Sequence, residues 1–147
     1  MNYTYRYALP SDQPRIEALF GEMLHAVYGE TKPVAPGAMS AYFSGGEDRI
    51  CLAESAGEVV AFLSMEVHRE EPHYVYLDDF CVIAAHRGCG IGTEMLREAE
   101  RFARLLGFRH LVLHVEKTND AARRLYERMG YEQLNDEGHR CSMIRNL

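Results

Sequence analysis

The spacing of apolar residues predicts strands and helices that alternate along the chain. Alternation of polar and apolar residues predicts strands at 3–9, 49–55, 58–67, 73–84, 109–116, 131–134 and 139–147. Apolar residues at helical spacing predict helices at 11–24, 93–106 and from Asn119 or Asp120 to Gly130, and a short helix is expected at 38–44. Ser11 or Asp12 can cap the first helix, and Gly107 stands where a C-terminal cap belongs. This order predicts a mixed sheet flanked by helices.

Composition narrows the class of protein. The 147 residues suit one domain, 1–147, and the pattern shows no internal repeat or linker. A net charge of -6 argues against nucleic-acid binding, which needs a basic face. No apolar run approaches the roughly 20 residues that a membrane span requires, and the start "MNYTYRYALPSDQ" lacks the pattern of a secretory signal.

The cysteines favour a reducing compartment. The four cysteines form no C-x-x-C pair, and no His or Cys cluster has zinc-binding spacing, so no metal is expected. Cys51, Cys81 and Cys141 lie in apolar or strand-like runs and are interpreted as free thiols. The expected location is therefore the cytoplasm.

The segment "AAHRGCGIGTEML" (84–96) places three glycines between a predicted strand and a predicted helix. The first turn of a helix has unpaired N–H groups and the positive end of the helix dipole, so backbone free of side chains can close on a diphosphate there. A tight turn alone would also explain the glycines. A dinucleotide fingerprint is disfavoured because Thr93 stands where its third glycine would be, and a P-loop is disfavoured because no lysine follows.

The remaining pattern, Arg-x-x-Gly-x-Gly, resembles the acetyl-CoA motif of the GNAT superfamily of N-acetyltransferases. Val82 stands five residues before Arg87, as in that family. A second segment, "TNDAARRLYERMGY" (118–131), is similar to the Asn…Ala…Leu-Tyr…Gly-Tyr signature near the family's C-terminus. The resemblance spans essentially the whole chain. It implies an α/β (α+β) fold with a mixed, mainly antiparallel sheet of six or seven strands and about four helices, and an enzyme that uses acetyl-CoA.

The resemblance also implies which residues bind the donor. Main-chain N–H groups from Gly88 to Thr93 would hold the diphosphate, with Arg87 opening the loop and Thr93 adding a hydroxyl. Cys89 and Ile91 would contribute through their main chain only. The pantetheine arm would lie beside the strand residues before the loop, and Asn119 would cap a helix and reach the pantetheine. The implied cofactor-binding residues are Phe80, Cys81, Val82, Arg87, Gly88, Cys89, Gly90, Ile91, Gly92, Thr93 and Asn119.

The same resemblance implies the chemistry. Tyr126 matches the family's usual general acid, which protonates the departing thiolate; the alternative is a tyrosine packed in the core. The Val82 N–H is the candidate that stabilises the oxyanion. Acetyl transfer also needs a neutral amine, although an alkyl amine with a pKa near 10.4 is almost fully protonated at pH 7.

Two carboxylates in "YVYLDDFCV" could bind or deprotonate that amine. Adjacent strand residues point to opposite faces, and Asp78 shares its face with Phe80 and Val82, so Asp78 is the catalytic candidate and Asp79 is not. The stretch also resembles the Tyr-Leu-Glu-Asp run of diamine and thialysine acetyltransferases, which suggests a small cationic amine. The alternative is that Asp79 pairs with an arginine and Asp78 only orders water.

Three functions remain open at this point. The first is transfer of an acetyl group from acetyl-CoA to a small primary amine. The second keeps the chemistry but acetylates a protein or peptide, and the third is a non-catalytic module that binds acyl-CoA. Tyr126 and the acidic strand argue against the third, because binding alone needs neither. The resemblance is also compatible with a homodimer.

Overall fold

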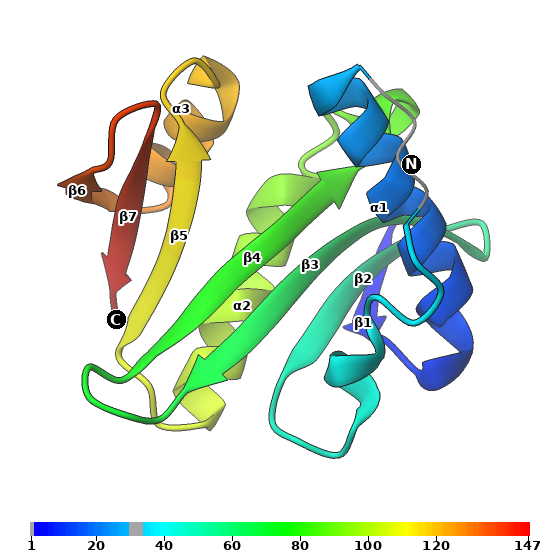
Figure 1. Cartoon of the computed structure of the whole chain (residues 1–147), viewed down its shortest axis with the longest axis horizontal. Helices are drawn as coiled ribbons and strands as arrows, with labels where there is room; N and C mark the ends of the chain where they lie inside the picture. Colours follow the sequence, from blue (N-terminus) through cyan, green and yellow to red (C-terminus); the bar gives the residue numbers. More distant parts are fainter. Residues whose placement is uncertain (1, 30–33) are drawn as a thin grey trace. The chain divides into compact units, whose positions relative to one another are not determined.

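The computed structural model describes residues 2–29 and 34–147, so part of the segment 29–37, which the sequence pattern indicates is a loop, lies outside the described residues. A seven-stranded sheet has the strand order β1-β2-β3-β4-β5-β7-β6 (Figure 1). Its strands are β1 Thr4–Tyr7, β2 Arg49–Ser55, β3 Glu58–His68, β4 Tyr74–Val82, β5 His110–Glu116, β6 Glu132–Asp136 and β7 Arg140–Asn146. The helices are α1 Gln13–Tyr28, α2 Ile91–Leu105 and α3 Asp120–Arg128. The mixed sheet predicted from the sequence is confirmed, because β4 pairs with β5 in parallel while β1–β2, β5–β7 and β6–β7 are antiparallel.

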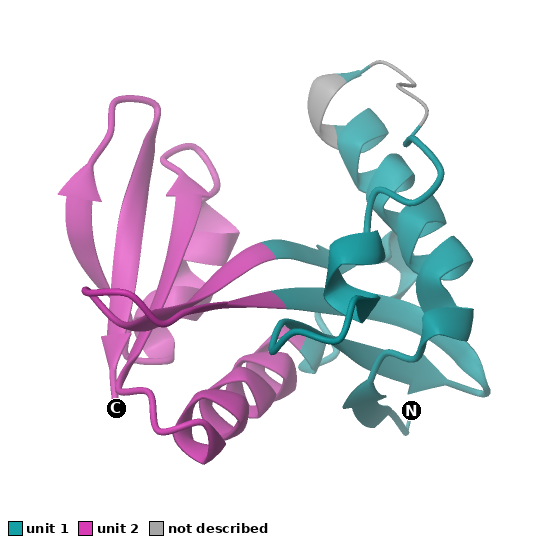
Figure 2. Cartoon of the chain, turned by 60° about the horizontal axis from the view of Figure 1, so that its bottom comes forward, with its two compact units in different colours: residues 1–64, 79–91 teal, residues 65–78, 92–147 magenta. Residues whose placement is uncertain are grey.

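The chain forms two compact units, which β3 and β4 both pass through (Figure 2). Unit 1 comprises residues 1–64 and 79–91, and unit 2 comprises residues 65–78 and 92–147. The core of unit 1 is a cluster of buried side chains from α1, the segment between α1 and β2, and strands β2, β3 and β4: Ile16, Leu19, Met39, Ile50, Leu52, Val59, Phe62 and Cys81. In unit 2, β5 buries Leu111, Leu113 and Val115 on one face, and α2 buries Met95, Leu96, Ala99 and Phe102.

Local chemistry explains where several elements turn. The two-residue turn between β2 and β3 has Ala56 and Gly57 both at positive φ, the geometry that lets adjacent strands keep their twist. Gly107, at φ +83°, follows the last turn of α2, and the N–H of Phe108 bonds to the carbonyl of Ala103 as in a glycine-capped helix. These positions agree with the turn and cap predicted from the sequence.

The expected helix at 38–44 is a short 3-10 helix, η2 (Ser40–Phe43), so the described residues contain three α-helices rather than about four. The segment is held from α1, because the carboxylate of Glu17 accepts hydrogen bonds from the N–H groups of Gly37 (3.3 Å) and Met39 (3.0 Å). The bond from Met39 is the main reason that the pKa of Glu17 is lowered. The Glu17 carboxylate thus binds two N–H groups just before the 3-10 helix begins.

The capping of α1 and the start of α2 also differ from the prediction. Asp12 precedes α1 as expected, but its carboxylate accepts the N–H of Leu9 (2.8 Å) and pairs with Arg6 (2.7 Å), and it makes no side-chain cap to α1. Arg6 and the N–H of Leu9 hold the pKa of Asp12 below its usual value. The second helix, α2, begins at Ile91, two residues before the expected start.

Gly130 gives a test of how the end of α3 is packed. Its φ is +90°, and a Cβ added there would lie 3.0 Å from Nε of Arg145, whose guanidinium is 3.4 Å from Glu100. Gly138 has nearly the same φ, +88°, but open space around it. We expect Gly138→Ala to lower the free energy of unfolding by about 1–2 kcal/mol through backbone strain, and Gly130→Ala to lower it further because Arg145 must move off Glu100. Urea unfolding of both variants measures this difference, and equal losses would show that Arg145 yields freely.

Candidate functional site

The sequence-predicted site residues are divided between the two units. Residues 80–91, from the end of β4 to the start of α2, belong to unit 1. Asp78, Gly92, Thr93, Asn119 and Tyr126 belong to unit 2. The two groups are therefore described one after the other.

The glycine segment of unit 1 is a loop with open space around it. After the 3-10 turn η3 (Ala84–His86), Gly88 and Gly90 have φ values of +74° and +84°, which L side chains rarely adopt. A Cβ added at either glycine would meet nothing within 4 Å. The glycines are thus required by the backbone conformation, and they leave the main chain accessible just before α2 starts. Gly92 is different, since it is the second residue of α2.

Arg87 ties this loop to the end of β4. Its Nε donates a hydrogen bond to the carbonyl oxygen of Val82 (3.1 Å). Val82 is half-buried, and the N–H of the next residue, Ile83, bonds to the carbonyl of Val60 on β3 (3.0 Å). These two bonds link the loop to the end of β4 and the end of β4 to β3.

The side chain of Cys81 has a structural role. The thiol is buried, donates to the carbonyl of Leu19 on α1 (3.7 Å), and has a pKa raised to about 11 by burial. A buried thiol with a raised pKa is unreactive. Any part that Cys81 plays in binding must come from its main chain, as the sequence interpretation holds.

Cys89 has partners that sequence reasoning missed. Its thiol is exposed and forms a side-chain hydrogen bond with Tyr3, whose hydroxyl also lies 2.8 Å from Nδ1 of His86. The bond to Cys89 is the main cause that raises the pKa of Tyr3 to about 12. Nothing in the local sequence pattern signals this contact, because Tyr3 lies 83 residues from His86.

In unit 2, Asp78 follows the last described pair between β4 and β5. The ladder joins Val75 to Leu111, Tyr76 to Val112 and Leu77 to Leu113, and it ends there although β5 continues to Glu116. Burial along β4 alternates as predicted: Val75 and Leu77 are buried, whereas Asp78 is exposed. Asp79, on the opposite parity, is half-buried, and its N–H bonds to the hydroxyl of the buried Ser64 (2.8 Å).

Tyr126 lies on α3 with 8% of its surface exposed, and its ring packs against Tyr131 at a centroid distance of 5.8 Å. Burial raises the pKa of Tyr126 to about 12. The pKa of Tyr131 is raised as well, mainly by burial. The phenol of Tyr126 therefore stays protonated at neutral pH, and its burial is also what a core tyrosine would show.

Asn119 acts as the cap that the sequence predicts. It precedes α3, and its side-chain oxygen accepts the N–H of Ala122 (3.2 Å). Thr93 is half-buried on the first turn of α2.

A pocket of about 410 Å³ in unit 2 was not predicted. The pocket lies over β5 and β7. On β5 it uses His110, Val112 and His114, which face away from the buried leucines of that strand. Their partners on β7 are Asn146, Ile144 and Ser142. A register shift in β6 lets both Leu134 and Asn135 line it. Its lining residues are Pro72, His73, Tyr74, His110, Val112, His114, Leu134, Asn135, Glu137, Ser142 and Ile144.

Two general properties complete the description. Among residues 2–29 and 34–147, no three His, Cys, Asp or Glu side chains are grouped so that they could hold a metal ion. Within that same part of the chain, no helix has the length and apolar character to cross a membrane.

Known proteins give the context for these features. Residues 15–131 match the acetyltransferase (GNAT) family. YwnH of Bacillus subtilis, which is provisionally named a phosphinothricin acetyltransferase, is 30% identical over 142 residues that cover 88% of this chain and 84% of that protein. The streptothricin acetyltransferase of Streptomyces lavendulae is 29% identical over 88% of this chain and 81% of its own length. The structure of yncA from Salmonella typhimurium, solved with its cofactor acetyl-CoA, has a TM-score of 0.80 at 21% identity and covers 99% of this chain and 94% of that one.

The raised pKa of Tyr126 predicts how stability depends on alkaline pH. Between about pH 10 and pH 12 the unfolded chain releases the phenol proton while the folded chain retains it, so Tyr126 makes the free energy of unfolding fall by up to about 1.4 kcal/mol per pH unit. Tyr126→Phe should make that fall less steep and leave the dependence below pH 10 unchanged. Urea unfolding across this range measures the slope, with the exposed Tyr7 replaced by Phe as control. A slope equal to that of the parent protein would contradict the burial of the phenol.

Proposed function

The chain belongs to the acetyltransferase (GNAT) family, and we propose that this acetyl-CoA-dependent N-acetyltransferase acts on a small primary amine, with Tyr126 as its general acid. The family match covers residues of both units, so we further propose that 1–147 works as one acetyltransferase domain. The observation that carries the proposal is the accessible, left-handed backbone at Gly88 and Gly90 directly before α2, in a chain that also retains a buried tyrosine on α3.

In this proposal the main chain from Gly88 to Thr93 binds the diphosphate of acetyl-CoA. The N–H groups at the start of α2 lack partners within the helix and lie at the positive end of its dipole. Open space beside Gly88 and Gly90 supports close approach of a ligand. The bond from Arg87 to the carbonyl of Val82 supports a role for Arg87 in holding the loop in shape.

The pantetheine arm is proposed to lie along the main chain of Phe80, Cys81 and Val82. The end of the β4–β5 ladder before Asp78 supports this, since strand residues beyond a ladder can offer their N–H and C=O groups to a ligand. The Val82 N–H is proposed to stabilise the oxyanion that forms when the amine attacks the thioester carbonyl.

The proton balance of the reaction gives Tyr126 its role. An ammonium group loses two protons when it becomes an amide: one goes to the departing thiolate and the other to solvent. We assign delivery of the first to Tyr126, because its burial keeps the phenol protonated at any working pH.

Two observations support the proposal that the acceptor is a small molecule. Two relatives that align with most of this chain are named for acetylation of small molecules, phosphinothricin and streptothricin. Unit 2 also contains a pocket of about 410 Å³, a volume in the range of small-ligand sites. Acetylation of a protein or peptide stays the second candidate; a diamine acceptor, suggested by "YLDDF", stays a prediction.

The experiment that tests the proposal is release of free thiol from acetyl-CoA in the presence of candidate acceptors. The panel comprises amino acids, aminoglycosides, polyamines, small apolar monoamines and peptides with free N-termini. Acceptor-dependent release with a small amine supports the proposal. Release with peptides alone would replace it with the second candidate, and thermal stabilisation by CoA without transfer to any acceptor would remove the catalytic proposal.

For Tyr126→Phe we expect a fall in kcat of about 10²–10⁴-fold, the usual contribution of a general acid. The melting temperature should change little at neutral pH, because the ring and its packing on Tyr131 are retained. Steady-state kinetics and a thermal melt on the same sample separate the two effects. Turnover equal to that of the parent enzyme would return Tyr126 to a packing role.

For Asp78→Asn we expect KM for a cationic amine to rise about 10-fold or more, because the exposed carboxylate on β4 is proposed to attract the ammonium. KM for acetyl-CoA should not change. Glu132→Gln, an exposed carboxylate on β6, is the matched control for a general loss of negative charge. An unchanged amine KM in Asp78→Asn, or an equal rise in both variants, would remove Asp78 from the site.

A further inference from the structure

A chain of three side chains connects β4 with the pocket of unit 2. The hydroxyl of Tyr76 lies 2.6 Å from Nδ1 of His114, and Nε2 of the same ring lies 3.0 Å from the carboxylate of Glu137. The three residues come from β4, β5 and the turn between β6 and β7. His114 and Glu137 line the pocket, and 23% of the His114 side chain is exposed.

The chemistry of the partners assigns the protons in this chain. An ionised carboxylate only accepts hydrogen bonds, so Nε2 of His114 must carry a proton toward Glu137. In the neutral ring, Nδ1 is then unprotonated and accepts the hydrogen bond of the Tyr76 hydroxyl. The hydrogen bond from His114 is the main cause that lowers the pKa of Glu137, which keeps this carboxylate ionised. A carboxylate that orients an imidazole, which in turn accepts a proton from a hydroxyl, is the arrangement of a proton-abstracting triad.

The position of Tyr76 places this chain next to the proposed acceptor residue. Tyr74, Tyr76 and Asp78 alternate along β4 and therefore share one face of the strand. Asp78 lies two residues from Tyr76, a separation of roughly 7 Å along a strand. Tyr74, two residues before Tyr76, lines the pocket. Along one face of β4, Tyr76 therefore lies between Tyr74, which lines the pocket, and Asp78.

The lining of the pocket indicates what it would bind. Pro72, Val112, Leu134 and Ile144 supply apolar surface, and Tyr74 adds an aromatic ring. Glu137 is the one carboxylate among the lining residues. A polyamine would bring several ammonium groups to a mostly apolar surface with a single counter-charge, which is unfavourable. A monoamine with an apolar body would place that body on this surface and leave its single ammonium group to Asp78.

We propose that the pocket of unit 2 binds the acceptor as a monoamine with an apolar body, and that the chain Tyr76–His114–Glu137 removes the proton from its ammonium group. The proposal rests on the N-acetyltransferase function proposed above and names its acceptor class and its base. Asp78 then attracts the ammonium, and His114 is the group that becomes charged.

The proton step balances within the chain. The ammonium N–H bond breaks as its proton moves to the Tyr76 oxygen, while the Tyr76 hydroxyl proton moves to Nδ1 of His114. The amine becomes neutral and nucleophilic, and His114 becomes an imidazolium that Glu137 stabilises through Nε2. His114 then returns this proton to solvent through the pocket. The amine nitrogen loses its second proton after the tetrahedral intermediate has formed. This loss balances the proton that Tyr126 gives to the thiolate.

The pH response of this step depends on every charged group near His114. Arg140 on β7 lies 3.6 Å from Glu137, and Glu116, on the same strand as His114, pairs with His139 (2.8 Å). Tyr76 on β4 and Glu137 in the β6–β7 turn contact His114 directly, and the other titratable residues that line the pocket are His73, Tyr74 and His110. Variants are therefore compared with a control that removes a different His–carboxylate pair of the same unit.

The test replaces His114 by Gln and measures acetylation of 2-phenylethylamine between pH 7 and pH 10. We expect kcat to fall about 10²–10⁴-fold at pH 7, with less than a threefold change in KM for acetyl-CoA. Without the base, the rate of the variant should rise up to tenfold per pH unit until the amine's own pKa near 10, because only the neutral amine reacts. The rate of the parent enzyme should level off at a lower pH. Equal pH profiles in the two proteins would overturn the proposal.

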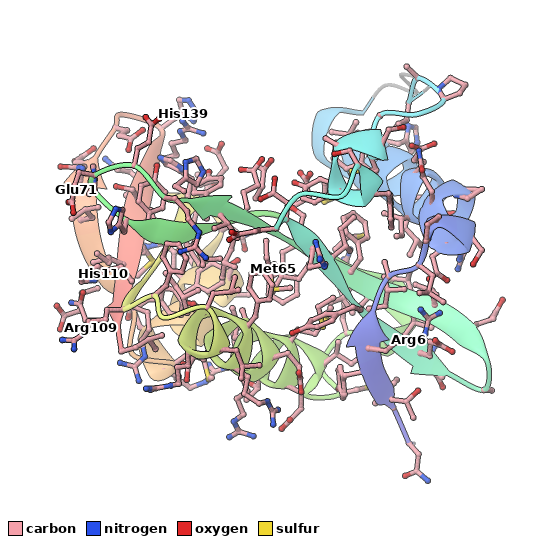
Figure 3. All side chains as sticks on the ribbon, turned by 90° about the horizontal axis from the view of Figure 1, so that it is seen from below. Arg6, Met65, Glu71, Arg109, His110 and His139 are labelled. Carbon is pink, nitrogen blue, oxygen red and sulfur yellow. The ribbon has the colours of Figure 1, made fainter. Side chains whose placement is uncertain are left out.

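His139→Gln is the matched control. His139 pairs with Glu116 but does not line the pocket, and it lies at the opposite end of the β5–β7 pair from His110 (Figure 3). We expect its kinetics and pH profile to equal those of the parent. Tyr76→Phe provides a second break in the chain that removes one oxygen atom only, and it should reproduce the steep profile even if His114→Gln folds poorly. A normal profile in a folded Tyr76→Phe would exclude the hydroxyl from proton transfer.

Binding to the pocket is tested without turnover, so its failure differs from failure of the proposed function. In ¹H–¹⁵N spectra of the histidine rings, 2-phenylethylamine should shift the signals of His114 and His110 in a saturable manner and leave those of His139 in place. Spermidine at the same concentration should cause at most a small shift. Saturable binding by an inactive protein would refute only the acetyl transfer, whereas active enzyme with unshifted pocket histidines, or with equal shifts for both amines, would refute the pocket proposal.

Discussion

The alternation of side chains along β4 is the constraint on which the rest of the structure depends. Val75, Leu77 and Cys81 face the buried side of the strand, and this burial fixes its register. The opposite parity then has to carry Tyr74, Tyr76 and Asp78. A register shift of one residue would move the apolar side chains to the exposed face and the polar ones to the buried face. Burial of the apolar residues therefore also fixes the positions of the polar residues. The bond from the Asp79 N–H to the hydroxyl of buried Ser64 supports the same register from β3.

A second constraint acts on the main chain that follows β4. The left-handed φ values at Gly88 and Gly90 would strain any L side chain, although space for one is present at both positions. The Nε of Arg87 donates a hydrogen bond to the carbonyl of Val82 and so links the loop to the end of the strand. In the proposed function, binding of acetyl-CoA therefore depends on backbone shape, whereas binding of the acceptor amine depends on side chains. This division explains how a family can keep one donor while its members act on different acceptors.

Much of the fold could be predicted from the sequence because its signals are local. The β2–β3 turn at Ala56 and Gly57, the cap at Asn119 and the glycine at the end of α2 are each specified by neighbouring residues. The short helix expected at 38–44 is a 3-10 helix, Ser40–Phe43, but the sequence pattern did not show that Glu17, 20 residues before Gly37, binds the N–H groups of Gly37 and Met39. The same limit applies to the site. Motifs located the loop and Tyr126, but the contact between Tyr76 and His114 joins residues 38 positions apart, and no spacing rule encodes it.

The two proton-transfer roles need opposite environments, and the chain offers both. A general acid for a thiolate has to remain protonated until the carbon–sulfur bond breaks, which favours a dry phenol such as Tyr126, with its pKa raised to about 12. A base for an ammonium group must instead gain a charge near neutral pH, which favours an imidazole that keeps partial access to water and has a carboxylate beside it. His114 meets both conditions through its exposed edge and Glu137. In this proposal, burial on α3 and hydrogen bonding on β5 thus separate the proton donor from the proton acceptor.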